Sequence, residues 1–162
     1  MGLIRIFTCI LLVGAAVETL RRGYAEILYA WPTRDRLERA TKIDPGNAFH
    51  HVAFGHWQEE AGQDPRVAYR AAVERLPADA LLWVRLGLAE EVSGNVTEAE
   101  RCLLEASRRS RKYDVRWALA NFFYRQQRQA EFVTWAKASM EMAYTDLRPL
   151  FELAWSLLGG GE

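Results

Sequence analysis

The residues of this chain best suited to catalysis or metal binding are its three histidines, its two cysteines and two adjacent pairs of glutamates. No carboxylate completes a metal-ligand set with His50, His51 and His56, and neither cysteine belongs to a CxxC motif. The glutamate pairs, at 59–60 and 90–91, are adjacent in sequence, so their carboxylates point to different parts of a helix surface. The chain also has no Gly-rich phosphate loop and no nucleophile elbow. We therefore expect no enzyme activity, no metal, no cofactor and no small-molecule substrate.

The size and charge of the chain argue against nucleic acid as a partner. The 162 residues are enough for one domain with a buried core, since half of them are hydrophobic. The 21 Lys and Arg residues equal the 21 Asp and Glu residues in number, so the formal net charge is zero. Without an overall positive field, we expect no general attraction to nucleic acid.

An internal repeat in the sequence predicts the helices that must position these residues. Four large side chains are each followed three positions later by alanine, and both series advance by 32, 34 and 32 residues. A third series, of ring-bearing residues, advances by 32 and 34. Large and small residues in fixed phase at this period predict helix–turn–helix units that stack on one another. The series are Leu37, Tyr69, Leu103 and Trp135; Ala40, Ala72, Ala106 and Ala138; and His51, Trp83 and Trp117.

The unit from 79 to 112 carries the pattern most completely. Trp83 and Gly87 mark its first helix, Gly94 marks its turn, and Leu103 marks its second helix. In these residues the chain resembles a bacterial member of the tetratricopeptide repeat family. The resemblance implies an all-α fold, a right-handed solenoid of helix–turn–helix repeats that ends in a C-terminal capping helix.

The resemblance also implies the division of the chain. Asn47 and Asp79 are expected to cap the first helices of two repeats, and Thr97 with Glu100 has the spacing of a capping box. The last repeat departs from the family pattern at Asn121 and has no glycine at its turn. The expected segments are an apolar N-terminal helix at 1–20, a weak first repeat at 17–46, repeats at 47–78, 79–112 and 113–145, a capping helix at 146–158 and a tail at 159–162.

The apolar run from Ile6 to Val17 raises the question of a membrane. Twelve residues of helix extend about 18 Å, against roughly 30 Å of bilayer hydrocarbon. The longer stretch from Leu3 to Leu20 would nearly suffice if Arg5 reached the interface. Three interpretations stay open: a cleaved secretory signal whose product is secreted, a retained anchor, and a buried helix of the solenoid. We expect a single N-terminal anchor in a bacterial inner membrane. The arginines on either side of the apolar run favour the cytoplasm as the location of the repeats, but only weakly.

The resemblance places a partner-binding groove on the first helices of the repeats, which form the concave surface in this family. The residues at those positions are mostly apolar, and an exposed apolar groove suits a hydrophobic helix or peptide. The alternative is that a tight superhelix, or the terminal helix of the chain itself, buries them. The groove positions are Phe49, Val52, His56, Leu81, Val84, Leu88, Val92, Phe122 and Arg125.

A cluster of five cations within nine residues forms a second candidate site. It could contact lipid headgroups, acidic glycans or an acidic partner. Alternatively it is a solvated connection whose charges pair with Glu105 and Asp114. The cluster comprises Arg108, Arg109, Arg111, Lys112 and Arg116.

These features together predict a non-enzymatic scaffold or adaptor, tethered to a membrane, that binds a helix or peptide of another protein. Two alternatives remain. One is a structural protein that self-assembles into filaments or oligomers through its terminal helices. The other is an accessory subunit of a membrane-bound complex in envelope or glycan assembly.

Overall fold

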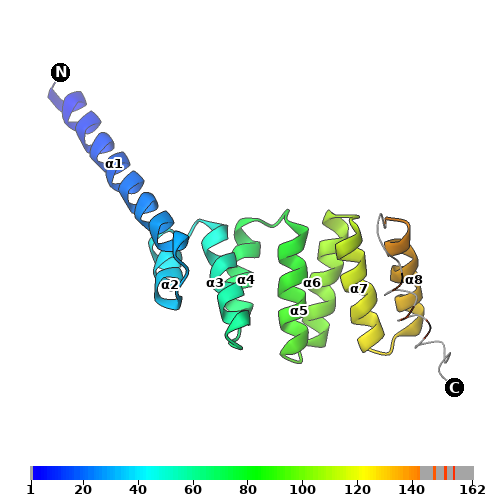
Figure 1. Cartoon of the computed structure of the whole chain (residues 1–162). Helices are drawn as coiled ribbons and strands as arrows, with labels where there is room; N and C mark the ends of the chain where they lie inside the picture. Colours follow the sequence, from blue (N-terminus) through cyan, green and yellow to red (C-terminus); the bar gives the residue numbers. More distant parts are fainter. Residues whose placement is uncertain (1, 143–147, 149–151, 153–154, 156–162) are drawn as a thin grey trace. The chain divides into compact units, whose positions relative to one another are not determined.

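The computed structural model describes residues 2–142 together with residues 148, 152 and 155. This part of the chain contains helices and turns but no strand, so the expectation of an all-α fold is confirmed (Figure 1). The predicted capping helix at 146–158 and the tail at 159–162 lie outside the continuous described range. The helices are α1 (Gly2–Ala30), α2 (Arg34–Ile43), α3 (Ala48–Glu60), α4 (Arg66–Arg75), α5 (Ala80–Val92), α6 (Val96–Arg109), α7 (Tyr113–Arg125) and α8 (Gln129–Met140).

The chain divides into two compact units, which we call unit 1 (Met1–Arg75) and unit 2 (Leu76–Glu162). In unit 1, α2 packs against both α1 and α3, and α3 packs against α4. In unit 2, α5 pairs with α6 and α7 pairs with α8, while α7 also contacts both helices of the first pair. Each unit is therefore a set of helical hairpins packed side by side.

The long helix α1 is packed only near its C-terminal end. Ala25 and Leu28 are buried, whereas the large apolar side chains from Ile6 to Leu20 are exposed. Among the described residues, no helix combines the length and the apolar character that crossing a membrane requires.

The first helix of each of three hairpins ends in the same turn. The second residue after each helix takes a left-handed backbone, with φ of 65° at Gly62, 82° at Gly94 and 58° at Gln127. In each case the backbone amides of this residue and of the following residue donate hydrogen bonds to carbonyls of the last helical turn. These carbonyls would otherwise have no partner within the helix. These bonds run from Gly62 and Gln63 to Glu59 and Gln58, from Gly94 and Asn95 to Glu91 and Glu90, and from Gln127 and Arg128 to Tyr124 and Phe123.

The caps at the start of α3 and α5 were predicted correctly. The side chain of Asn47 accepts from the Phe49 amide at 3.0 Å, and that of Asp79 accepts from the Leu81 amide at 2.9 Å. The capping box predicted at Thr97 was wrong. Helix α6 has Asn95 as its N-cap, two residues before Thr97, because the left-handed turn before it already directs the chain into the helix.

Two glycines allow the helices of a hairpin to approach closely. A Cβ at Gly55 would lie 2.5 Å from Cε1 of the buried Tyr69 ring, and a Cβ at Gly87 would lie 2.9 Å from Cγ of Leu103. The periodic large residues of α4 and α6 therefore pack on flat glycine sites of α3 and α5, as the repeat pattern predicts.

Both units also contain a proline carbonyl that collects two hydrogen bonds at the start of a hairpin. In unit 1 the Pro45 carbonyl accepts from Nε2 of His51 at 3.0 Å and from the guanidinium of Arg75. In unit 2 the equivalent carbonyl accepts from an indole Nε1 at 2.9 Å and from an arginine that also lies over that indole ring. The residues of this second set are Pro77, Trp83 and Arg109.

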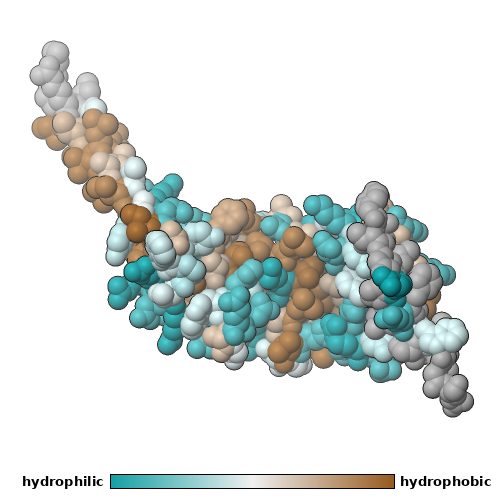
Figure 2. Space-filling model, viewed as in Figure 1, coloured by the Kyte–Doolittle hydropathy of each residue, from teal (hydrophilic) through white to brown (hydrophobic). Residues whose placement is uncertain are grey.

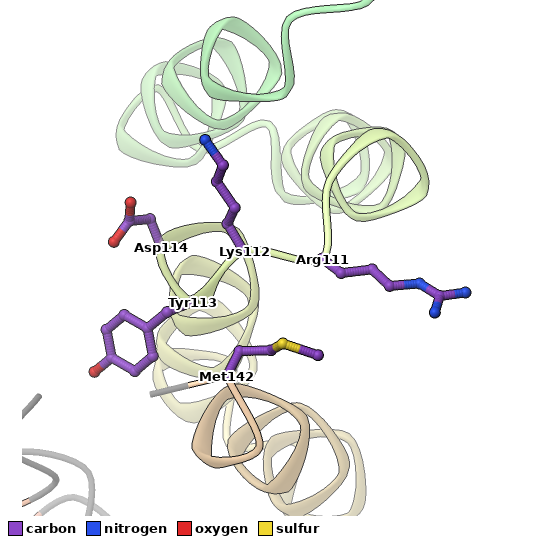
Figure 3. A pocket seen from close by; sticks show the side chains of 5 residues that line it. All are labelled: Arg111, Lys112, Tyr113, Asp114 and Met142. Carbon is purple, nitrogen blue, oxygen red and sulfur yellow. The ribbon is translucent and has the colours of Figure 1, made fainter. Parts of the chain in front are cut away.

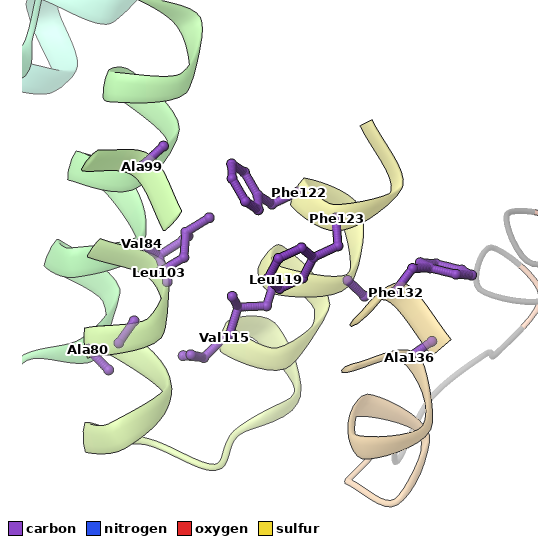
Figure 4. Close-up of a cluster of buried hydrophobic side chains, with 12 residues drawn as sticks. Ala80, Val84, Ala99, Leu103, Val115, Leu119, Phe122, Phe123, Phe132 and Ala136 are labelled. Carbon is purple, nitrogen blue, oxygen red and sulfur yellow. The ribbon is translucent and has the colours of Figure 1, made fainter. Parts of the chain in front are cut away.

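Unit 2 has a continuous apolar core between its two hairpins (Figure 4). Phe122 and Phe123 of α7 meet edge to face, with ring centroids 5.2 Å apart. Trp83, Leu88 and several other partly buried side chains pack around this core. The core comprises Ala80, Val84, Ala99, Leu103, Ala106, Val115, Leu119, Ala120, Phe122, Phe123, Phe132 and Ala136.

Candidate functional site

Unit 1 contains a pocket of about 320 Å³ where the end of α1, the start of α2 and one face of α3 meet. Three residues of the predicted groove, Phe49, Val52 and His56, lie along its α3 wall. These positions are three and four residues apart, so they share one side of the helix. The complete lining is Tyr29, Pro32, Leu37, Phe49, Val52, Ala53, His56, Trp57 and Glu60.

The walls of this pocket are mostly apolar, with polar groups near one end. Phe49 is 64% exposed, so its ring is available to a partner, while Leu37 is buried in the wall opposite. His56 is held edge-on to the Tyr69 ring, with centroids 6.0 Å apart, and the Tyr69 hydroxyl donates to Glu59 at 2.6 Å. The pocket can therefore take a bulky apolar side chain, with the exposed carboxylate of Glu60 beside it for a cation.

The remaining groove residues, all in unit 2, divide between surface and core. Leu81 and Val92 are exposed on α5, whereas Val84 and Phe122 belong to the buried core. The reason is that α5 and α7 pack against each other and cover the side chains between them. Leu88 is partly buried against the same core. The side chains of Val84 and Phe122 are thus not open to a partner within this unit.

Arg125, the charged groove residue, forms a structural ion pair. Its guanidinium donates to both carboxylate oxygens of Glu91, at 2.9 and 2.6 Å, and Gln126 donates to the same carboxylate at 3.2 Å. The forked arginine contact joins α7 to α5. Arg125 therefore stabilises the packing of the two hairpins and is already engaged.

The cationic cluster is mostly paired with neighbours. Arg108 and Arg109 both donate to Glu105, and these contacts, with that of Arg109 as the larger, hold the pKa of the Glu105 carboxyl below its ordinary value. Arg116 donates to the Ala138 carbonyl at 2.6 Å, and its guanidinium lies 3.6 Å from Glu141. Three of the five cations thus have structural partners.

The other two cations, Arg111 and Lys112, are exposed and border a second pocket of about 500 Å³. Figure 3 shows that their side chains leave the backbone in different directions and do not converge on one point. Tyr113 lies on the opposite side, stacked on Trp117 with ring centroids 6.0 Å apart, and burial raises the pKa of its hydroxyl. The pocket walls hold no convergent set of charges for an anion.

The three histidines have separate roles. His50 is fully buried, with Nε2 3.3 Å from the Glu26 carboxylate of α1. Burial lowers the pKa of His51, with a further contribution from the nearby charge of Arg75, so His51 is neutral at pH 7 and donates to Pro45. In the described part of the chain, no three His, Cys, Asp or Glu side chains are grouped as they would be to hold a metal ion.

The groove predicted from the sequence did not include every residue that lines the unit 1 pocket. Ala53 and Glu60 continue the series of Phe49, Val52 and His56 along one helix face, so extending that spacing could have found them. Tyr29 and Pro32 come from the preceding hairpin, and no periodicity relates them to α3. No protein-family model matches the chain, and no curated protein shows significant similarity to it.

Proposed function

We propose that this chain is a non-catalytic interaction module that binds an apolar helix or peptide of another protein in the unit 1 pocket. The observation that carries this proposal is that three groove residues, chosen on repeat position alone, line one open pocket together. The turns, the caps and the proline-carbonyl bonds recur at the repeat spacing, which supports a tetratricopeptide-like solenoid as the architecture.

The pocket favours binding because its walls are held in place before a partner arrives. Leu37 is buried on one side, and Gly55 fixes the distance between α3 and the Tyr69 ring on the other. Part of the free-energy cost of association is the ordering of mobile groups, so a preformed wall of helices lowers that cost. The partner needs one large aliphatic or aromatic side chain, with a Lys or Arg near Glu60.

A photo-crosslinking amino acid at position 49 tests the proposal in the cells that make the protein. A matched control carries the crosslinker at position 67, because Val67 lies on α4 of the same unit, is 79% exposed and does not line the pocket. We expect position 49 to capture one defined polypeptide and position 67 not to capture it. Val52→Glu should abolish the capture, since it places a carboxylate in the apolar wall.

Native mass spectrometry of the gently extracted protein identifies what has been captured. A different polypeptide supports the adaptor function, and a fixed stoichiometry within a membrane-bound enzyme specifies an accessory subunit. Capture of the same chain would instead favour a self-assembling structural protein. Equal capture at positions 49 and 67, or none at position 49, would refute the pocket as the binding site.

A further inference from the structure

The N-terminal two thirds of α1 is an apolar helix whose large side chains are exposed. Every large apolar residue from Ile6 to Leu20 is more than half exposed, although α1 continues without a break into the packed part of unit 1. Figure 2 shows hydrophobic atoms gathered along the face of α1 that is in view. An apolar surface of this extent on a soluble helix is unfavourable unless something covers it. The residues are Ile6, Phe7, Ile10, Leu11, Leu12, Val13, Val17 and Leu20.

The distribution of these side chains around the helix decides what can cover it. Ile10, Leu11, Leu12 and Val13 are consecutive, and consecutive residues of a helix lie about 100° apart, so these four alone reach all sides. A groove on a protein partner, or one helix of a second copy, would cover a single stripe and leave the rest in water. Lipid surrounds a helix, and therefore matches an apolar surface without a polar face.

The residues that follow this segment suit the boundary between hydrocarbon and water. Arg21 and Arg22 both donate to Glu18, at 2.7 and 2.9 Å, so the first carboxylate of the helix is neutralised where the apolar segment ends. Tyr24 comes next, and it is half exposed. Aromatic rings and arginines are the side chains enriched at the level of lipid headgroups.

We propose that α1 enters a lipid bilayer with the segment from Ile6 to Leu20, and that Arg21, Arg22 and Tyr24 lie at the headgroup level. At 1.5 Å per residue the 15 residues extend about 22 Å, less than the roughly 30 Å of bilayer hydrocarbon, so the segment enters the hydrocarbon without crossing it. From Ala25 onward the same helix is covered by protein instead, because Ala25 and Leu28 are buried in unit 1. This proposal does not rest on the function proposed for the pocket.

The positions of the two cysteines allow a direct test. Cys9 is exposed in the middle of the apolar segment, whereas Cys102 is fully buried in unit 2, so a thiol-reactive fluorophore labels Cys9 on the folded protein. The labelled full chain is diluted from mild detergent into vesicles of phosphatidylcholine and phosphatidylglycerol. We expect a blue shift of the emission and quenching by lipids that carry a nitroxide on the acyl chain.

A charge in the apolar segment should remove this response. Leu12→Glu should weaken partitioning at least about tenfold, because a carboxylate is costly inside hydrocarbon. The matched control is Val67→Glu, which places the same charge at an exposed valine of the same unit and should bind vesicles like the parent. Circular dichroism of both variants confirms that the helices are retained.

Three results would overturn the proposal. One is emission that vesicles leave unchanged, and another is equal vesicle binding by the Leu12→Glu variant and the parent. The third is a blue shift that grows with protein concentration in the absence of lipid, since it would show that a second copy of the chain covers α1.

Discussion

The hairpins α3–α4 in unit 1 and α5–α6 in unit 2 follow the same plan and use their apolar side chains differently. Their first helices have equivalent caps, turns and proline-carbonyl bonds. Val84 is 9% exposed and belongs to a closed core, whereas its counterpart Val52 lines an open pocket beside the exposed Phe49. The polar framework of a repeat is thus compatible with either a stable interior or a binding surface.

The largest contrast between the units is expected for two phenylalanines. Phe122→Ala empties a fully buried site in unit 2 and should lower the free energy of unfolding by about 3–5 kcal/mol. Phe49→Ala removes a ring that is already mostly exposed and should change that free energy by less than about 0.5 kcal/mol, while it weakens binding of the partner. Hydrogen exchange resolved by segment measures both effects. Equal losses of protection would show that the two units do not differ in this way.

An intermediate effect is expected at the two close-approach glycines. Gly55→Ala drives a Cβ into the Tyr69 ring, which cannot rotate away because its hydroxyl is bonded to Glu59, and should cost about 2–3 kcal/mol. Gly87→Ala meets Leu103, whose branched side chain can shift slightly, and should cost about 1–2 kcal/mol. Denaturant titration gives both values.

The control for these glycines is Gly23→Ala. A Cβ at Gly23 has no neighbour within 4 Å, so the substitution should stabilise the helix by about 0.5–1 kcal/mol. If Gly55→Ala behaved like this control, the close packing of α3 on Tyr69 would be disproved.

The smallest expected difference between the units is in how their stability depends on pH. The pKa of His51 is lowered in the folded state, so folding disfavours its protonation. The resulting stability is complete above the ordinary pKa of 6.5 and is lost as the pH falls through the lowered value. Burial opposes the positive charge, and the hydrogen bond to the Pro45 carbonyl favours it, so the loss of stability in unit 1 should be modest.

Exchanging the two rings tests this assignment. His51→Trp should reduce the loss of unit 1 stability between pH 7.5 and pH 5, because indole does not titrate. Trp83→His should introduce such a loss into unit 2, next to the positive charge of Arg109. Thermal melting across this pH range measures both changes, and an unaltered pH dependence in His51→Trp would assign the titration to another group.

Much of the local structure could be predicted from residue type and spacing. Asn47 and Asp79 cap helices because their side chains reach a backbone amide two residues on, which is a local geometric property. The turn at Gln127 could not be predicted from residue type, since a glutamine with positive φ is uncommon. The hydrogen bonds and packing of α7 and α8 impose that backbone on it.

Taken alone, the sequence determined the helices, the caps of α3 and α5, and the period at which large side chains meet small ones. These features depend on contacts between residues close in the chain and on a regular spacing. Only the tertiary structure decided which apolar residues became core and which became surface. Val52 and Val84 hold equivalent repeat positions, and their burial differs because Tyr29 and Pro32 border an opening beside one, while α7 covers the other. The neighbours that close or open a helix face come from distant parts of the chain, which spacing along one helix does not encode.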